Sequence, residues 1–259
     1  MTEKYKYIYG PVPSWRLGSS LGIDLLSQKE KVCNFSCLYC QLGETPEYTT
    51  ERKIYVPTKD VLDEIKSLPE VKIDYFTFSG RGEPTLAKNL GETIRTLKET
   101  RKEPVAILTN SSLIDKKEVR SELAEADFVA LKLDAYSESS FDRINKPAPG
   151  IKFESIIEGM KKFKDEFSRK LALQIMFIDK NKNYVDELIK IVKEINPDEV
   201  QINTPLRPCK VKPLSREEIT IIKEKFEILD SDIVSVYEAE HKKVKSISNE
   251  DTLRRRGKI

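Results

Sequence analysis

Short apolar runs alternate with amphipathic helical patterns along most of this 259-residue chain. The apolar runs are rich in β-branched and aromatic residues, as strands are, and lie at residues 20–26, 73–78, 105–108, 128–133, 171–177 and 199–203. Helical patterns lie between them, at residues 58–68, 90–97, 115–126, 153–167 and 185–195. Thr58 could cap the first of these helices, and the proline-rich opening at residues 10–15 is expected to be extended. This alternation favours a parallel sheet with right-handed crossovers. A closed barrel of eight units would need more chain. We therefore predict an α/β fold, an open partial (β/α)6 TIM-like barrel.

The pattern changes character after residue 204. Ser215 and Glu218 match a capping box, which predicts the start of another helix. A further strand is expected at residues 233–237, and the basic end at residues 253–259 is expected to be frayed. The sequence thus predicts a core domain at residues 1–204 and a short C-terminal extension at residues 205–259.

Composition and charge exclude several classes of protein. The net charge of +2 argues against a strongly basic nucleic-acid surface, although a local basic patch is compatible with it. No run approaches the roughly 18 apolar residues of a membrane span, and the N-terminus lacks the apolar core of a signal peptide. Four cysteines, three of them clustered, do not indicate a disulfide framework. We expect a cytoplasmic protein with no membrane partner.

The clustered cysteines are Cys33, Cys37 and Cys40, with the spacing C-x3-C-x2-C. A [4Fe–4S] cluster usually takes four thiolate ligands, so three would leave one iron open to a small molecule. A structural zinc site is the alternative, and it would need a fourth ligand from far along the chain. Cys209 and His241 are the candidates for that ligand.

The cysteine spacing, with Tyr39 directly before the last cysteine, resembles the signature of the radical S-adenosylmethionine (SAM) enzymes. The resemblance implies a [4Fe–4S] cluster on the three cysteines and SAM bound through its amino and carboxylate groups at the open iron. It also implies reductive cleavage of SAM and hydrogen abstraction from a substrate. An electron donor such as ferredoxin or flavodoxin would be a partner.

A glycine-rich segment follows the second predicted strand, at residues 80–84. It resembles the glycine–glycine–glutamate motif of the same superfamily, which receives the amino group of SAM. The motif would place Gly80, Gly82, Glu83 and Pro84 at the cofactor, and Tyr39 is also predicted to lie there. Arg81 splits the glycine pair, which is a departure from the motif. An ordinary glycine turn is the alternative.

Further polar residues lie at the ends of later strands, where ligands bind in parallel α/β folds. Asn110 and Asp134 are candidate cofactor ligands, with turn-forming or capping roles as the alternative. Gln174 and Met176 share one face of a strand and would border the cofactor if that face is the interior, although Met176 also suits an apolar core.

Two residues are candidates for catalysis. Lys132 is a catalytic or carboxylate-binding group, or else the partner in a salt bridge to a neighbouring strand. Cys209 lies in a turn beyond the last predicted barrel strand, and some radical SAM enzymes use an extra cysteine as a hydrogen-atom donor. A plain structural thiol is the alternative for Cys209.

Several segments are similar to a group of uncharacterised, Fe–S oxidoreductase-type radical SAM proteins that are distantly related to the tRNA wybutosine-synthesising enzymes. They lie at residues 10–18, 20–22, 82–86 and 203–208. The wybutosine enzymes use additional N-terminal cysteines, and this sequence has none before Cys33. The sequence is also compatible with a glycyl-radical activating enzyme, and with a non-catalytic iron–sulfur or zinc module. The substrate stays open between a small molecule, an RNA and a protein.

Overall fold

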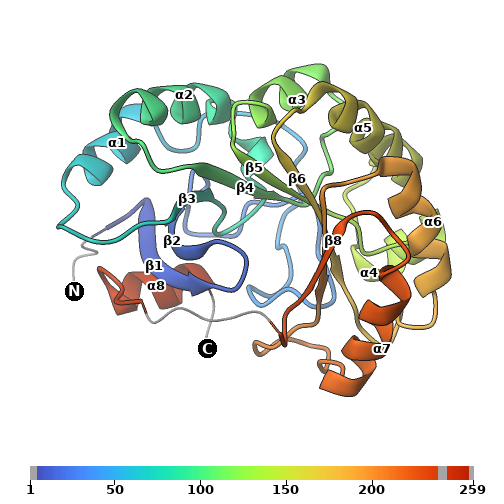
Figure 1. The fold of residues 1–259 in the computed structure, drawn as a ribbon. Coiled ribbons are helices and arrows are strands. Elements are labelled where there is room, and N and C mark those ends of the chain that lie inside the picture. The colour runs from blue at the N-terminus through green and yellow to red at the C-terminus, as the bar shows by residue number, and fades with distance from the viewer. Residues whose placement is uncertain (1–4, 239–243, 257–259) are drawn as a thin grey trace.

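The computed structural model describes residues 5–238 and 244–256. In this part of the chain eight strands form one sheet, whose spatial order follows the chain (Figure 1). The strands are β1 (Ile8–Ser14), β2 (Gly18–Ile23), β3 (Tyr75–Phe78), β4 (Val105–Thr109), β5 (Phe128–Lys132), β6 (Lys170–Met176), β7 (Glu199–Asn203) and β8 (Asp232–Ser235). β1 pairs with β2 in the antiparallel sense, and each later neighbouring pair is parallel.

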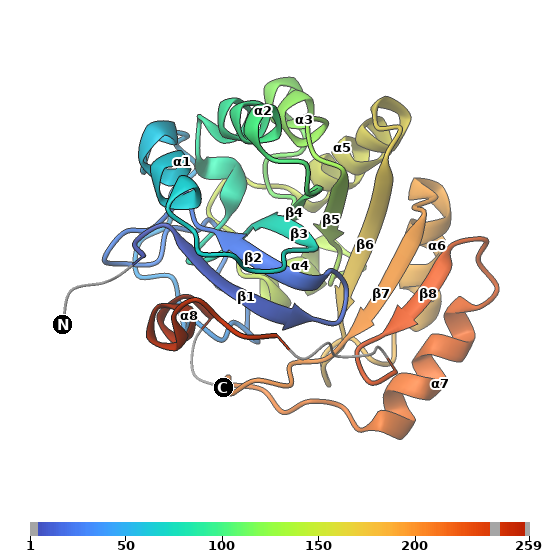
Figure 2. The same cartoon turned by 60° about the vertical axis from the view of Figure 1, so that its left-hand side comes forward.

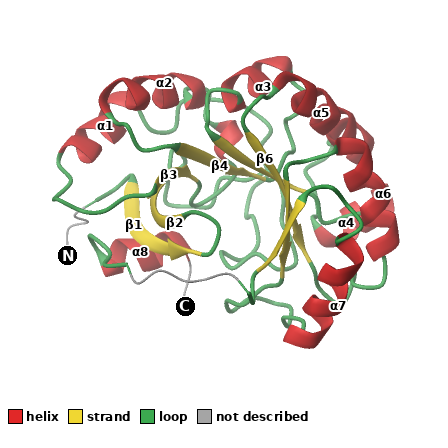
Figure 3. Ribbon diagram, viewed as in Figure 1, coloured by secondary structure: helices red, strands yellow, loops and turns green. Residues whose placement is uncertain are grey.

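Helices cover the outer face of the curved sheet, as Figures 2 and 3 show. In chain order the described helical elements are α1 (Thr58–Lys66), the 3-10 turn η1 (Pro84–Leu86), α2 (Leu90–Thr100), α3 (Lys117–Leu123), α4 (Glu138–Ile144), α5 (Phe153–Glu166), α6 (Val185–Ile195), α7 (Arg216–Phe226) and α8 (Asn249–Arg256). The last of them, α8, does not cover the outer face but lies along the edge strand β1. None of these described helices is both long and apolar enough to cross a membrane. The predicted partial TIM-like barrel is confirmed, and its six predicted strands are β2 to β7.

Two apolar layers hold the sheet. The larger one lies between the sheet and the helices, and includes buried residues such as Ile94 on α2 and Val192 on α6. A smaller cluster occupies the concave side, where Leu17 packs with Ala106, Phe128, Ala130 and Ala172. Three of these five side chains are alanines, so they fill little of the interior. Leu17 comes just before β2, and Phe128 is the first residue of β5, so this cluster lies near the start of the strands. It leaves room for a cavity of about 490 Å³, which Leu17 and Ala130 help to line.

The sheet has two strands beyond the six of the predicted barrel, of which only the first was not expected. The proline-rich opening of the chain, expected only to be extended, forms the antiparallel edge strand β1. β8 lies within the expected range 233–237 except for its first residue, and it pairs with β7. Residues beyond 204 therefore extend the same sheet, and the division at residue 204 stays a prediction.

Local capping was predicted correctly in one place and wrongly in another. Ser215 and Glu218 form the predicted capping box at the start of α7. Thr58 does not cap α1, because Pro57 occupies the cap position and makes no side-chain bond there. The Thr58 hydroxyl instead accepts a hydrogen bond of 3.0 Å from the Asn89 side chain. The seven-residue helix α4 was not predicted at all.

The C-terminal segment is folded onto the first strand, so the expectation of a frayed end is wrong for residues 253–256, which belong to α8, while residues 257–259 lie outside the described part of the chain. Ile247 N donates to Gly10 O at 2.6 Å, and Gly10 N donates to the Thr252 hydroxyl at 3.0 Å. The Arg255 guanidinium bonds to the carbonyl of Lys6 and lies 3.8 Å from the carboxylate of Asp24.

Asp24 and Arg255 form this contact in a buried place, with 1% and 3% of their surfaces exposed. Burial raises the pKa of Asp24 to about 6, while the nearby Arg255 charge opposes that rise. The positive charge of Arg255 therefore offsets part of the free-energy cost of burying the ionised carboxylate of Asp24.

We expect Arg255→Met to lower the free energy of unfolding at pH 8 by about 3–5 kcal/mol, because it leaves a buried carboxylate without its cation. The loss should be smaller at pH 5, where Asp24, with a pKa of about 6, is mostly protonated. Urea unfolding at both pH values measures this difference, and Asp24→Asn in the same background should restore part of the loss.

The matched control for this variant is Lys59→Met, which breaks the exposed ion pair between Lys59 and Asp63. It should cost much less than Arg255→Met, because an ion pair in contact with solvent contributes little to stability. Equal losses for the two variants would show that Arg255 is an ordinary surface residue.

Candidate functional site

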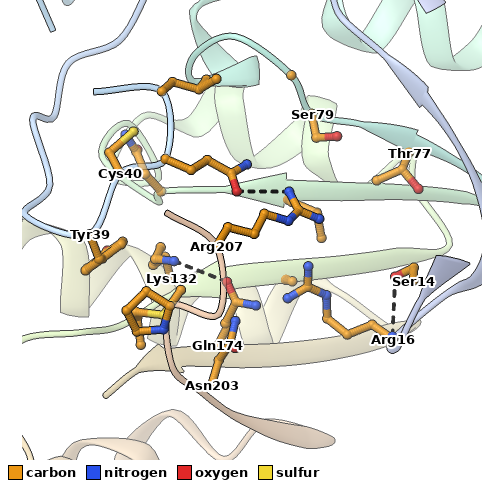
Figure 4. A pocket seen from close by; sticks show the side chains of 18 of the residues that line it. Ser14, Arg16, Tyr39, Cys40, Thr77, Ser79, Lys132, Gln174, Asn203 and Arg207 are labelled. Atoms are coloured by element: carbon orange, nitrogen blue, oxygen red, sulfur yellow. Dashed lines mark hydrogen bonds between the residues drawn. The ribbon is translucent and has the colours of Figure 1, made fainter. Parts of the chain in front are cut away.

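The three clustered cysteines lie in the long loop that follows β2, at the end of the sheet where the parallel strands finish. Cys33, Cys37 and Cys40 are free thiols, and all three line one cavity of about 490 Å³. Cys33 is buried, whereas the other two are partly exposed. The structure therefore brings the three predicted ligands to one cavity, and Figure 4 shows Cys40 at its wall, on the same side as Tyr39.

The cysteine loop is attached to the glycine-rich segment by backbone hydrogen bonds. Val32 N donates to Arg81 O at 3.2 Å, and Glu83 N donates to Val32 O at 3.1 Å. A Cβ atom on Gly82 would coincide with the carbonyl oxygen of Val32. The absence of a side chain at Gly82 therefore allows the cysteine loop to come close to this segment, whether or not a ligand also approaches it.

Gly80 is needed for a different reason. Its φ is +134°, and an added Cβ would lie 2.5 Å from the carboxyl carbon of Asp24. Both glycines of the split pair are therefore required by close contacts within the protein, with Asp24 and with Val32. Arg81, between them, points away and donates hydrogen bonds to the carbonyls of Gln28 and Lys29.

Glu83 joins the ends of β3 and β4. Its carboxylate is 1% exposed and accepts hydrogen bonds from the Thr109 hydroxyl at 2.6 Å and from Asn110 N at 2.6 Å. Burial raises the pKa of Glu83, and these hydrogen bonds oppose the rise. Glu83 also lines the cavity, so its predicted contact with the cofactor stays compatible with its place.

Each of the three sulfur atoms has a nitrogen donor beside it. Asn110 Nδ2 lies 3.8 Å from Cys33 Sγ. Asn145 Nδ2 lies 3.6 Å from Cys37 Sγ. Lys31 Nζ lies 3.2 Å from Cys40 Sγ. Donors of this kind stabilise thiolates and, in iron–sulfur proteins, tune the cluster potential.

The chemistry of this donor set fits a cationic cluster. Burial raises the pKa of Cys33 to about 12 and that of Cys37 to about 11. Such thiols ionise at neutral pH when metal cations bind them. Cys33, Cys37 and Cys40 would hold the cluster, and the three nitrogen donors would surround its ligands.

Asp134 organises the cysteine loop from behind. Its carboxylate accepts hydrogen bonds from the Tyr39 hydroxyl, from Asn145 Nδ2 at 3.0 Å and from Met176 N at 2.7 Å. It does not line the large cavity. These contacts support a bracing role, and its predicted direct contact with the cofactor stays a prediction.

Lys132 and Gln174 lie side by side on β5 and β6. Lys132 Nζ donates to Gln174 Oε1 at 3.2 Å and lies 4.8 Å from the centre of the Tyr39 ring. Figure 4 shows both side chains at the cavity, near Tyr39. The Met176 side chain also lines it and packs beside Tyr39.

Most of the predicted site residues line the same cavity. They are Cys33, Cys37, Tyr39, Cys40, Gly80, Gly82, Glu83, Asn110, Lys132, Gln174 and Met176. Pro84, Asp134 and Cys209 do not line it. The Cys209 thiol donates to Val211 O at 3.2 Å and packs with the apolar cluster around Ile178. His241 lies outside the described residues.

Sequence reasoning missed several contributors to the site. Lys31 and Asn145 are the donors to two of the sulfurs, and Arg16 and Arg207 line the cavity. Arg207 donates to Gln41 Oε1 at 2.9 Å, which ties it to the residue after the last cysteine. Arg16 and Arg207 lie in segments that the sequence analysis used only for their similarity to other radical SAM proteins. Their positive charge was the one feature of the sequence that could have marked them as candidate site residues.

A single-ion zinc site has no support in the described part of the chain. No three His, Cys, Asp or Glu side chains in residues 5–238 and 244–256 are placed to hold one metal ion together. The three cysteines line one cavity in common.

We expect Gly82→Ala to reduce the iron bound after anaerobic reconstitution, because the new Cβ displaces the backbone of Val32 and with it the cysteine loop. Iron per chain is the measurement. Gly150→Ala is the control, since its Cβ would meet no atom within 4 Å and only its positive φ is strained. Full iron content in Gly82→Ala would contradict the close approach.

We expect Asp134→Asn to speed the loss of iron to a chelator, because its amide cannot accept all the hydrogen bonds that Tyr39, Asn145 and Met176 donate to the carboxylate. The rate of bleaching of the cluster measures this. Normal iron retention combined with weaker SAM binding would instead support the direct cofactor contact.

Comparisons with known proteins agree with this geometry. The family model described as the Radical SAM superfamily matches residues 31–203. UPF0026 protein slr1464 from Synechocystis is 40% identical over 218 residues, which cover 84% of this chain and 81% of that protein.

Solved structures show the same fold at low identity. Streptococcus suis SuiB bound to S-adenosylmethionine has a TM-score of 0.61 and 18% identity, with 80% of this chain and 48% of that chain covered. Archaeal TYW1 has a TM-score of 0.58 and 15% identity, with 84% and 74% covered. Radical SAM enzymes use a [4Fe–4S] cluster and SAM, and both are cofactors of this chain. The chain belongs to the radical SAM superfamily.

Proposed function

We propose that this chain is a radical SAM enzyme that holds its cluster on Cys33, Cys37 and Cys40 and abstracts hydrogen from a substrate inside the half-barrel. The observation that carries the proposal is the opening of all three free thiols, each with its own nitrogen donor, into one cavity of about 490 Å³. When bound, the reduced cluster supplies the one electron that splits SAM into methionine and a 5′-deoxyadenosyl radical.

The residues around the cysteines have distinct tasks. Asn110, Asn145 and Lys31 direct N–H groups toward the sulfurs and so stabilise their negative charge. Asp134 holds Asn145 and the hydroxyl of Tyr39 in place. The predicted roles of Gly80, Gly82 and Glu83 toward the amino group of SAM are part of the proposal, and Lys132 is the candidate for its carboxylate.

The cavity itself protects a reactive intermediate. Leu17 and Ala130 belong to the apolar cluster that closes the interior near the start of the strands, and both line the cavity. An enclosed apolar floor excludes water and limits side reactions of a reactive species. The partial exposure of Cys37 and Cys40 leaves a route for an electron from a ferredoxin or flavodoxin. We expect such a reductant in the cytoplasm.

The narrower activities have less support. Likeness to archaeal TYW1, at 15% identity, concerns the fold alone, and this sequence has no cysteine before Cys33 for a second cluster. No described contact favours a glycyl-radical activating role. Cys209 lies outside the cavity, so a plain structural thiol suits its place better than a hydrogen-atom donor.

The decisive experiment is anaerobic. We expect the reconstituted protein, given dithionite and SAM, to form 5′-deoxyadenosine, which mass spectrometry quantifies. Cys37→Ala should form none, because it removes a cluster ligand. Cys209→Ala is the matched control, since it removes a thiol outside the cavity and should keep both iron and product.

The opposite outcome has a clear meaning. A wild-type protein with about four irons per chain that forms no 5′-deoxyadenosine would indicate a structural or electron-transfer cluster. A colourless protein that binds zinc instead of iron would contradict the cluster itself.

A further inference from the structure

The three nitrogen donors beside the cysteine sulfurs differ in charge and in distance. Asn110 and Asn145 offer uncharged amide groups, at 3.8 Å and 3.6 Å from their sulfur atoms. Lys31 offers an ammonium group at 3.2 Å from Cys40 Sγ. Hydrogen bonds from a charged donor are shorter and roughly twice as strong as those between neutral groups. Cys40 is therefore the ligand with the strongest donor.

The two asparagine amides are shared between sulfur and oxygen acceptors. Asn110 Nδ2 also donates to Asn34 Oδ1 at 2.8 Å. Asn145 Nδ2 also donates to the Asp134 carboxylate at 3.0 Å and to the Tyr39 hydroxyl oxygen at 3.2 Å. An amide nitrogen has two hydrogens, so Asn145 divides them among three acceptors. One of these acceptors is an anion, which lies close to the same sulfur and opposes the stabilisation of its negative charge.

Lys31 is bound only to the cysteine loop in the described part of the chain. Its ammonium group has three N–H bonds, and it donates to Cys40 Sγ and to the carbonyl of Gly43 at 3.0 Å. Gly43 N donates in turn to Cys40 O at 3.0 Å, so the ammonium group and the backbone hold the same turn. Glu44, the next residue, is paired with Lys210 instead. The charge of Lys31 therefore acts on Cys40 without a paired carboxylate.

A fixed positive charge favours the more negative of two redox states. A [4Fe–4S] cluster gains one negative charge when it takes up one electron, and its potential depends on the hydrogen bonds to its sulfur atoms and on nearby charge. An ammonium group in contact with a ligand sulfur stabilises the reduced state more than the oxidised state. Lys31 is half-buried at the wall of the cavity, where salt screens its charge less than on the open surface.

We propose that Lys31 is a positioning residue that raises the reduction potential of the cluster through its charged hydrogen bond to Cys40. The inference rests on the proposed function, because it concerns the cluster of the same site. A higher potential makes one electron easier to take up from a ferredoxin or flavodoxin, and leaves less driving force for the reductive cleavage of SAM. Lys31 sets the balance between these two steps.

A purely structural role would use the same two contacts, since they tie residue 31 to the turn at residues 40–43. The two roles differ in what they require. A structural latch needs a hydrogen-bond donor at residue 31, whereas an effect on the reduction potential needs a positive charge there. Replacing Lys31 with an uncharged donor therefore separates them.

The experiment is an anaerobic redox titration of the reconstituted full chain. Dithionite supplies the electrons, and electron paramagnetic resonance measures the fraction of reduced cluster. We expect Lys31→Gln to lower the ratio of reduced to oxidised cluster about tenfold at the midpoint potential of the wild type. For a one-electron couple this is a shift of about 59 mV to a more negative potential. Lys31→Arg keeps the charge and should stay close to the wild type.

The matched control is Lys29→Gln, which removes the same charge from an exposed side chain two positions away. Solvent and salt screen a charge at the surface, so this variant should leave the midpoint potential unchanged. Lys31→Met, which keeps the aliphatic stem, is the second uncharged variant. It should show the same shift as Lys31→Gln, and it provides the measurement if Lys31→Gln does not retain its iron.

Four outcomes would overturn the inference. They are an unchanged midpoint potential in Lys31→Gln, an equal shift in Lys29→Gln, an equal shift in Lys31→Arg, and loss of iron from both uncharged variants, which would make Lys31 a structural latch. Iron content and the change in the cluster spectrum on adding SAM are measured on each preparation. Failure of the wild type in those two measurements counts against the proposed function, whereas their success without a shift in potential counts only against this inference.

Discussion

The site depends on the backbone contact between Val32 and the segment from Arg81 to Glu83. Through it the cysteine loop meets the glycine-rich turn at an isolated parallel bridge between Val32 and Gly82. This contact brings thiols that follow β2 to the carboxylate that follows β3. Only a residue without a side chain permits it, because the position of a Cβ on Gly82 is occupied by a carbonyl oxygen.

Local patterns predicted the parallel core of the fold. The six runs from residue 20 to residue 203 are apolar enough to be buried, and amphipathic helices separate them, so few topologies remain. β1 was missed because two prolines and a glycine interrupt the strand pattern in its sequence. It also pairs antiparallel with β2, so it does not belong to the repeated strand–helix pattern on which the prediction was based. The burial of Arg255 was missed because a basic terminal run has the composition of a solvated tail.

The candidate site divides in the same way. The cysteines and the residues of the glycine-rich segment were predicted because their spacing is short and local. Asn145, which donates to Cys37 Sγ, was not predicted, because the two residues are 108 positions apart in the sequence and no local pattern pairs them. Asp134 was selected for the right reason, its place at a strand end, but its oxygens are used by Tyr39, Asn145 and Met176. Contacts of high sequence separation determine such roles.

The sheet does not close on itself, since its edge strands β1 and β8 do not pair with each other in the described structure. A closed barrel admits a larger molecule only by breaking hydrogen bonds between strands, whereas an open one can widen at its seam with each ladder intact. The helix α8 lies along the β1 side of that seam and is held there by Gly10, Thr252 and Arg255. On this side the open seam is bordered by a helix held through a few individual hydrogen bonds, whereas the cysteine loop, with its own backbone contact to residues 81–83, is attached elsewhere.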